Sequence, residues 1–322
     1  MHTKSFSIGM DIGGTNIAFG IVNRHGDILK QHNLKTADYG SPQIFVEALK
    51  GYLGEYFSEF GKDEITGIGI GAPNGNIYTG NIEHAPNLVW KGTVPLAEMV
   101  TQAVGLPVTV TNDANATAIG EMTYGAAKGM KDFLVITLGT GVGSGFVANG
   151  QLIYGHDGFA GELGHTIAIR GGRHCGCGRK GCLETYTSAT GIVRTAMELL
   201  ENAGETNTEH PDWLANVNAR NGKVASADIH KAAVAGDPLA LEIFEFTGKI
   251  LGQSLADAVA ITSPEAIILF GGLAKAGTYI IGPTKRHMEE NLLYVYQNKI
   301  DIMPSGLSER DAAILGSASL VW

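Results

Sequence analysis

The chain contains two copies of one local pattern: an apolar strand, a glycine-rich turn and a second apolar strand. Residues 5–22 form the first copy and residues 133–148 form the second. The matching positions are Phe6 with Phe133, Gly14 with Gly141, and Phe19 with Phe146. A short glycine turn between two apolar runs is typical of a β-hairpin. Two hairpins with the same internal spacing therefore predict two duplicated α/β domains.

Apolar periodicity and turn residues divide the remaining chain into alternating strands and helices. The predicted strands are residues 5–11, 17–22, 27–34, 65–71, 107–111, 133–138, 144–148 and 266–270. The predicted helices are residues 42–60, 96–104, 114–124, 189–203, 226–235, 237–260 and 311–321. Alternation of this kind is typical of an α/β fold. We expect a smaller first domain of residues 1–120 with about 305–322, and a larger second domain of residues 121–304.

Charge and composition exclude several classes of protein. The net charge is −9, whereas nucleic-acid-binding surfaces are basic, so we expect no nucleic-acid partner. No apolar run approaches the roughly 18 residues that span a bilayer, and the first residues lack the apolar core of a signal peptide. An odd, clustered set of cysteines suits a reducing compartment. These features predict a cytoplasmic protein with no membrane partner.

All three cysteines of the chain, Cys175, Cys177 and Cys182, lie in one short glycine-rich segment. Three clustered thiols cannot all pair as disulfides, but thiolates are good zinc ligands, and a structural zinc site takes four ligands. A histidine must then complete the set. His165 can fold back over a loop, whereas His174 adjoins Cys175 and would need a cramped chelate; both remain candidates. Three reduced thiols without a metal are the alternative.

The two glycine-rich turns are candidate phosphate sites. Backbone N–H groups of such turns form a concavity that binds anions, and Asp11 beside the first turn suits a hydrated Mg²⁺ carried by a phosphate. Gly271-Gly272 forms a third glycine turn after a strand and leaves room for a nucleoside. The sequence contains no GxxxxGK[ST] motif, so the turns are not a P-loop. A tight hairpin without a ligand is the simpler interpretation of one turn, but two equivalent turns favour binding.

Asn112-Asp113 follows one predicted strand and begins a predicted helix. Both residue types favour the helix N-cap, and the local sequence alone favours that structural role. A carboxylate at this position can also accept a proton from a hydroxyl that attacks a phosphoryl group. We expect the positive end of the helix dipole to keep Asp113 ionised.

Five segments resemble the ROK family of sugar kinases, and they occur in the family's order over nearly the whole chain. They are MDIGGTN from Met10, NDANA from Asn112, LGTGVGSG from Leu138, GELGH from Gly161 and CGCGRKGCLE from Cys175. GELGH followed by the three-cysteine segment is the most specific part. The resemblance implies two actin-like (ribonuclease H-like) α/β domains with a cleft between them and a zinc-braced loop in the second.

The same resemblance implies roles for individual residues, with Asp113 as the general base. The implied sugar-binding residues are Asn87, Asn112, Glu162, His165 and Glu184. The implied ATP- or phosphate-binding residues are Asp11, Gly13, Gly14, Thr15, Asn16, Thr140, Gly141, Gly271 and Gly272. The implied metal ligands are His165, Cys175, Cys177 and Cys182, so that His165 is preferred over His174 and uses its second ring nitrogen toward the sugar. Glu162 and His165 are three residues apart, and a helical turn would place them on one face.

The expected reaction is phosphorylation of a hexose, with glucose converted to glucose 6-phosphate, and with ATP, Mg²⁺ and a structural Zn²⁺. Fructose, mannose, allose, N-acetylglucosamine and N-acetylmannosamine are alternative substrates, because the shared motifs contact hydroxyls common to many hexoses. The segment 73–90 also departs from the commonest glucokinase-like pattern, since Asn74 follows Pro73 where a second glycine is frequent. The resemblance implies a homodimer or a homotetramer.

Two other functions belong to different classes. A sugar-responsive transcriptional regulator of the same family carries a helix-turn-helix domain before the kinase-like part, and only ten residues precede Asp11. A catalytically inactive sugar-binding protein would not need Asp113 or the glycine turns, which are intact. We therefore expect an enzyme.

Overall fold

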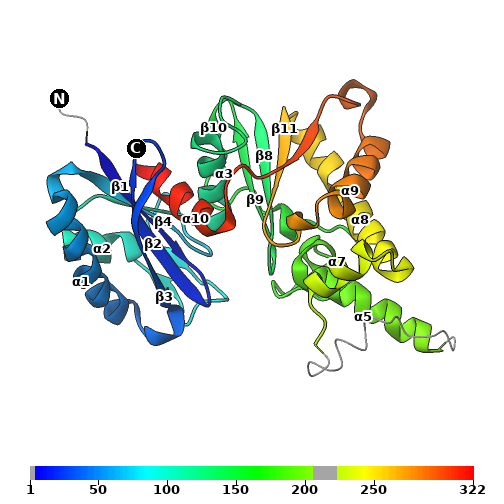
Figure 1. Ribbon diagram of the computed structural model, residues 1–322, viewed down its shortest axis with the longest axis horizontal. Coiled ribbons are helices and arrows are strands. Elements are labelled where there is room, and N and C mark those ends of the chain that lie inside the picture. Colours follow the sequence, from blue (N-terminus) through cyan, green and yellow to red (C-terminus); the bar gives the residue numbers. More distant parts are fainter. Residues whose placement is uncertain (1–3, 206–222) are drawn as a thin grey trace. The chain divides into compact units, whose positions relative to one another are not determined.

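The computed structural model describes residues 4–205 and 223–322, which form a mixed α/β fold with two five-stranded sheets (Figure 1). The first sheet has the order β3-β2-β1-β4-β7 and the second the order β10-β9-β8-β11-β12. In both orders the hairpin strands come first and the strands reached through helices follow. The duplicated α/β architecture predicted from the repeated hairpins is therefore confirmed.

The strands of the first sheet are β1 (Phe6–Ile12), β2 (Asn16–Asn23), β3 (Ile28–Lys35), β4 (Ile65–Gly71) and β7 (Val108–Thr111). Those of the second are β8 (Phe133–Leu138), β9 (Val142–Ala148), β10 (Gln151–Leu152), β11 (Ala266–Phe270) and β12 (Asp301–Pro304). A two-stranded sheet pairs β5 (Ile82–Glu83) with β6 (Thr93–Val94).

The helices are α1 (Pro42–Phe60), α2 (Leu96–Val104), α3 (Asp113–Thr123), α4 (Glu184–Thr187), α5 (Ala189–Glu205), α7 (Ser226–Val234), α8 (Pro238–Thr262), α9 (Thr278–Asn291) and α10 (Glu309–Ala318). Short 3₁₀ helices include Thr36–Asp38 and Leu163–His165. Within the part of the chain that the structure describes, no helix combines the length and the apolar character needed to cross a membrane.

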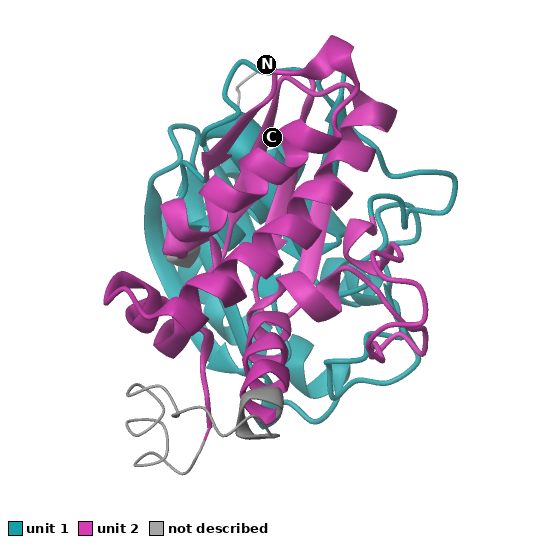
Figure 2. Ribbon diagram, turned by 90° about the vertical axis from the view of Figure 1, so that its right-hand side faces the viewer, with its two compact units in different colours: residues 1–131, 145–161, 305–322 teal, residues 132–144, 162–304 magenta. Residues whose placement is uncertain are grey.

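The chain separates into two compact units (Figure 2). Unit 1 comprises Met1–Lys131, Gly145–Gly161 and Ser305–Trp322, and unit 2 comprises Asp132–Ser144 and Glu162–Pro304. The boundaries of the two functional domains expected from the sequence remain a prediction.

The first sheet shows how strand alternation builds unit 1. Successive side chains of a strand point to opposite faces. In β1, Ile8 and Met10 join the buried core that also contains Leu49 of α1. Gly9 points to the other face, where an added Cβ would lie 1.9 Å from the carbonyl oxygen of Ile314 in α10. Glycine on this face therefore lets the backbone of α10 pack directly on the sheet.

β4 repeats this division between its two faces. Ile68 and Ile70 lie in the core on the α1 side, whereas a Cβ on Gly69 would lie 1.8 Å from the carbonyl oxygen of Ser317 in α10. In the sequence Ile-Gly-Ile-Gly at 68–71, the isoleucines form the apolar face of the strand. The glycines form the opposite face, on which α10 packs closely.

Most predicted elements are confirmed within one or two residues. Asn149-Gly150 connects β9 to β10, and both residues have the positive φ values, 52° and 74°, that a tight hairpin turn requires. The sequence analysis missed α9 and β12. Pro283 and Gly282 weaken the helical pattern of α9, and its stability comes from packing on α8, where Cβ atoms on Gly248 and Gly252 would collide with Pro283 and Thr284.

Candidate active site

The first glycine turn connects β1 to β2 and is held by Thr36, the residue that follows β3. The N–H of Gly13 donates to the carbonyl of Asn16 (2.9 Å), and buried Thr36 donates its N–H to the Thr15 carbonyl (3.0 Å) and its Oγ1–H to the Gly13 carbonyl (2.7 Å). The N–H groups of Gly14 and Thr15 have no acceptor among the described residues. The turn therefore presents unused donors to an anion. No sequence signal pointed to Thr36.

Asp11 and Asp113 lie close together at one end of the first sheet. Asp11 pairs with Gly71 across β1 and β4, and a Cβ on Gly71 would lie 3.5 Å from the Cα of Asp113. Burial, and then the neighbouring Asp113 carboxylate, raise the pKa of Asp11 to about 7. Two carboxylates in one place repel each other unless a proton or a cation is shared between them.

Asn112 and Asp113 begin α3 as the sequence predicts. Asn112 is the N-cap, and the N–H of Ala114 donates both to Asn112 Oδ1 (2.9 Å) and to Asp113 Oδ1 (2.8 Å). That the helix dipole keeps Asp113 ionised remains a prediction. Although Asp113 reaches solvent, the surrounding protein removes enough water to raise its pKa, and the bonds from backbone N–H groups offset this only in part. A raised pKa makes the carboxylate a better proton acceptor.

Asp11→Asn should stabilise the metal-free protein increasingly as the pH rises. The unfolded chain releases the Asp11 proton near 3.8, the ordinary pKa of an aspartate, and the folded chain releases it near 7. Between these values the unfolded state is favoured by ionisation, so wild-type stability falls with pH, and asparagine removes this loss. The melting temperature of the variant minus that of the wild type should grow between about pH 4 and pH 7 and level off above pH 7, measured without Mg²⁺ or nucleotide. Asp63→Asn is the control, and a difference that does not grow would contradict the raised pKa.

Asn87, a predicted sugar-binding residue, lies against the first glycine turn. A Cβ on Gly14 would lie 2.6 Å from the Asn87 carbonyl oxygen and 3.3 Å from its Cβ. The segment is fixed by Trp90, whose Nε1–H donates to the Tyr39 carbonyl (2.8 Å), and by Lys91, whose ammonium donates to the Leu88 carbonyl (2.9 Å). Unit 1 therefore contains the predicted base, the first phosphate turn and two predicted sugar-binding residues, Asn87 and Asn112.

The second glycine turn, between β8 and β9, lies in unit 2 beside the third glycine pair. β8 and β11 are parallel neighbours in which Thr137 pairs with Phe270. Gly271 has a φ of 102°, and a Cβ there would lie 2.8 Å from the Leu138 carbonyl oxygen. Two glycine segments far apart in the sequence are thus adjacent, as a nucleotide site requires. The N–H groups of Thr140 and Gly141 have no acceptor in the described part of the chain.

Glu162 and His165 lie on a 3₁₀ turn, Leu163–His165, of which Glu162 is the N-cap. The His165 N–H donates to the Glu162 carbonyl (3.1 Å). The predicted helical turn is thus a short 3₁₀ turn, and the shared face of the two side chains remains a prediction. Leu163 anchors this turn to β9, because its N–H donates to Ser144 Oγ (3.1 Å).

The predicted metal ligands His165, Cys175, Cys177 and Cys182 form one cluster, with their ligand atoms all within 4.8 Å of one another. Cys175 Sγ lies 3.7 Å from His165 Nδ1, and Cys177 Sγ lies 3.6 Å from Cys182 Sγ. Two sulfurs of a tetrahedral zinc site with Zn–S of about 2.3 Å are about 3.8 Å apart. The four residues therefore fit a closed zinc site. His174 is exposed and is not part of the cluster.

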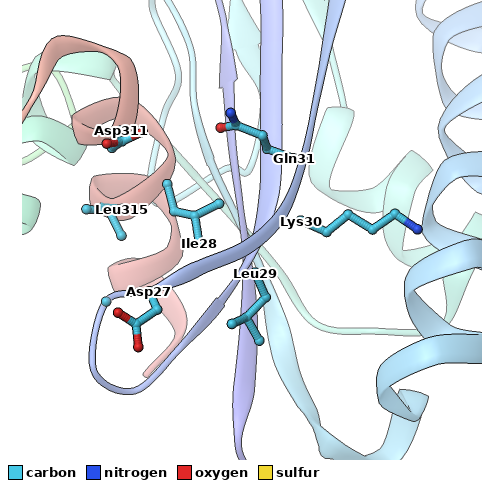
Figure 3. Close-up of a pocket in the computed structure, with 8 residues that line it drawn as sticks. Asp27, Ile28, Leu29, Lys30, Gln31, Asp311 and Leu315 are labelled. Carbon is cyan, nitrogen blue, oxygen red and sulfur yellow. The ribbon is translucent and has the colours of Figure 1, made fainter.

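An open depression in unit 1 lies apart from these residues (Figure 3). It is bordered by Asp27, Ile28, Gln31, Asp311 and Leu315, among others. Because Phe6 pairs with Asn23 and Ile12 pairs with Ile17, the turn beside Asp27 is at the opposite end of β1 from Asp11. No predicted site residue contributes to this depression.

Comparison with known proteins identifies the family. The family model described as "ROK family" matches residues 7–322. A glucokinase from Halalkalibacterium halodurans is 37% identical over 319 residues, covering 98% of this chain and 94% of that protein. An N-acetylmannosamine kinase from Citrobacter koseri is 30% identical and covers 98% of both chains. The crystal structure of a ROK family glucokinase from Streptomyces griseus in complex with glucose and AMPPNP has a TM-score of 0.80 at 32% identity, covering 98% of this chain and 99% of that one. The chain therefore belongs to the ROK family.

Proposed function

We propose that this ATP-dependent sugar kinase phosphorylates hexoses and that glucose is its preferred substrate, giving glucose 6-phosphate. The observation that carries the proposal is the placement of Asp113 beside Asp11, next to a glycine turn with unused N–H donors. Phosphoryl transfer to a hydroxyl needs a proton acceptor, a cation site and donors for phosphate oxygens. The similarity to glucokinases supports glucose.

Asp113 accepts the proton of the attacking hydroxyl as general base, and Asp11 would hold the Mg²⁺ that accompanies ATP. The backbone of each glycine turn is assigned to phosphates, and Gly271-Gly272 to the nucleoside. The residues assigned to ATP or its phosphates are Asp11, Gly13, Gly14, Thr15, Asn16, Thr140, Gly141, Gly271 and Gly272. The raised pKa of Asp113 supports its role, because a carboxylate whose pKa lies nearer the working pH is the more effective base.

The sugar is held by amide, carboxylate and imidazole groups, which can each form two directional hydrogen bonds with neighbouring hydroxyls. The residues assigned to it are Asn87, Asn112, Glu162, His165 and Glu184. Nδ1 of His165 is the ring nitrogen near Cys175, so Nε2 is the one assigned to the sugar. A metal-bound histidine commonly uses its second nitrogen in this way, which fixes the ring orientation.

Zinc, held by His165, Cys175, Cys177 and Cys182, would brace this loop. Four protein ligands leave no open coordination position, so the metal supplies structure and no activated water. Cys177 is partly prepared for a metal: burial raises its pKa, but the Arg179 backbone N–H and guanidinium hold it at a lowered value of about 6.

The expected assembly is a homodimer or homotetramer, without a nucleic-acid partner, and light scattering in solution checks it. Another hexose, an N-acetylhexosamine or a regulatory role without turnover are the alternatives. The 30% identity to an N-acetylmannosamine kinase is the reason that N-acetylhexosamines are included in the substrate panel.

A substrate panel with Mg²⁺ and ATP tests the proposal. We expect kcat/KM for glucose to exceed that for fructose, mannose, allose, N-acetylglucosamine and N-acetylmannosamine by at least about tenfold, the low end of the discrimination that a small change in a substrate produces. A higher value for another sugar would reassign the substrate. Sugar binding by calorimetry with no turnover of any of them would favour the regulator, and polyphosphate in place of ATP tests the donor.

A further inference from the structure

Glu184 touches both the metal-ligand cluster and the second phosphate turn. It is the first residue of α4. One carboxylate oxygen, Oε1, lies 3.5 Å from Cys175 Sγ, and the other, Oε2, accepts the N–H of Val142 at 3.1 Å. Val142 immediately follows Gly141 and begins β9. One side chain therefore connects the loop assigned to the sugar with the turn assigned to the nucleotide.

The contact with the turn depends on the glycine at position 141. A Cβ on Gly141 would lie 2.2 Å from Glu184 Oε2 and 3.3 Å from its Cδ, and no other described atom beyond its chain neighbours comes within 4 Å. Gly141 does not have a positive φ. Glycine here leaves space for the carboxylate, and a methyl group would displace that carboxylate from its present position.

The remaining contacts fix the back of the turn and leave its front available. The Gly139 carbonyl accepts the Ala189 N–H (2.8 Å), the Thr140 carbonyl accepts the Thr190 Oγ1–H (2.7 Å), and the Gly143 N–H donates to Thr137 Oγ1 (3.0 Å). Among these partners Glu184 is the charged one. A hydrogen bond from an N–H to an ionised carboxylate is stronger than one between neutral groups, so the bond from the Val142 N–H to Glu184 contributes to holding the turn in place.

We propose that Glu184 is a positioning residue for the nucleotide and couples sugar binding to nucleotide binding. Its carboxylate sets the position of the second phosphate turn through the Val142 N–H. A sugar hydroxyl that binds the same carboxylate changes its position and therefore the affinity of the turn for phosphate. The inference rests on the proposed function, which assigns Glu184 to the sugar alone.

Calorimetric titration of Mg²⁺–AMPPNP, with and without glucose, tests the inference on the full chain. Glu184→Ala should weaken AMPPNP binding about tenfold even without sugar, since a bond to a charged group is lost. It should also abolish the change in AMPPNP affinity that glucose produces in the wild type, a coupling that is reciprocal between the two ligands. Glu184→Gln keeps an oxygen that can accept the Val142 N–H, and should recover most of the AMPPNP affinity.

Gly141→Ala provides an independent variant that keeps the carboxylate but displaces it. It should weaken AMPPNP binding as Glu184→Ala does, and the double variant should lose no more than either single one, because both act through one contact. Gly139→Ala is the matched control: the same methyl group enters the same turn with no atom within 4 Å, and its effect should be much smaller.

Unchanged or tighter AMPPNP binding in Glu184→Ala, or equal effects of Gly141→Ala and Gly139→Ala, would overturn the inference. These outcomes differ from those expected if the proposed function is wrong. If it is wrong, the wild type itself would bind no AMPPNP or would phosphorylate no sugar.

Discussion

Asp113→Asn should lower kcat by roughly 10²–10⁴-fold, the contribution of a positioned general base, while glucose affinity stays close to that of the wild type. Asparagine has nearly the same shape and keeps the Oδ1 that accepts the Ala114 N–H, so the start of α3 should be preserved. It cannot take the proton of the attacking hydroxyl. Steady-state kinetics with saturating Mg²⁺ and ATP give kcat, and calorimetry gives the glucose affinity.

The pH dependence of the wild type provides a second check on the same residue. Only the ionised carboxylate acts as a base, so kcat should rise with pH through the pKa of Asp113. That acidic limb should lie above the ordinary range for aspartate, because burial raises this pKa. Asp63→Asn, on the exposed 3₁₀ turn Lys62–Glu64, is the matched control and should keep the wild-type kcat. Near-normal turnover in Asp113→Asn would eliminate Asp113 as the base.

His165→Ala should lose the metal, whereas His174→Ala should keep it. Only His165 places a ring nitrogen in the cysteine cluster. Loss of a ligand should cost more than the roughly 10–100-fold in metal affinity that loss of a ligand's hydrogen-bond partner costs. Elemental analysis should find about one zinc per chain in the wild type and in His174→Ala, and far less in His165→Ala. The melting temperature should fall in His165→Ala only.

Cys182→Ser separates the two roles of His165. Cys182 is fully buried and has no assigned contact with the sugar. If the metal positions the sugar through His165, this variant should lose zinc and also raise KM for glucose. Folded wild-type protein free of zinc, or equal zinc in both histidine variants, would refute the four-ligand site.

The sequence predicts those parts of the site whose chemistry is concentrated in short segments. Cys175, Cys177 and Cys182 predict a metal site because three thiols close in sequence are typical zinc ligands. The residues that hold the two glycine turns in place could not be predicted in this way. Thr36 reaches Gly13 only because β3 pairs with β2, and Glu184 fills the space beside Gly141 only because α4 packs near β9. Such contacts depend on pairing between distant segments, which leaves no local pattern.

The same distinction applies to the fold. α1 has a clear apolar periodicity, a Ser41 cap and Pro42 at its first position, and its predicted bounds match the observed ones. α9 has a proline inside the helix and few apolar residues in register, so its local pattern is weak. Packing against α8 determines its structure, which is a case of tertiary context overriding local propensity.

The position of α10 along the chain has a consequence for biosynthesis. β1 and β4 leave the ribosome before α10, and their Gly9 and Gly69 face α10. Chains emerge from the N-terminus, so α1 and α2 can cover one face of the first sheet early, while the glycine face lacks α10 until that helix is synthesised. The residues of unit 2 come before α10 in the sequence, so unit 2 can finish folding first. A chain that stalls before α10 would thus carry a completed second unit and an unfinished first one, which makes the nascent first sheet the part most in need of a chaperone.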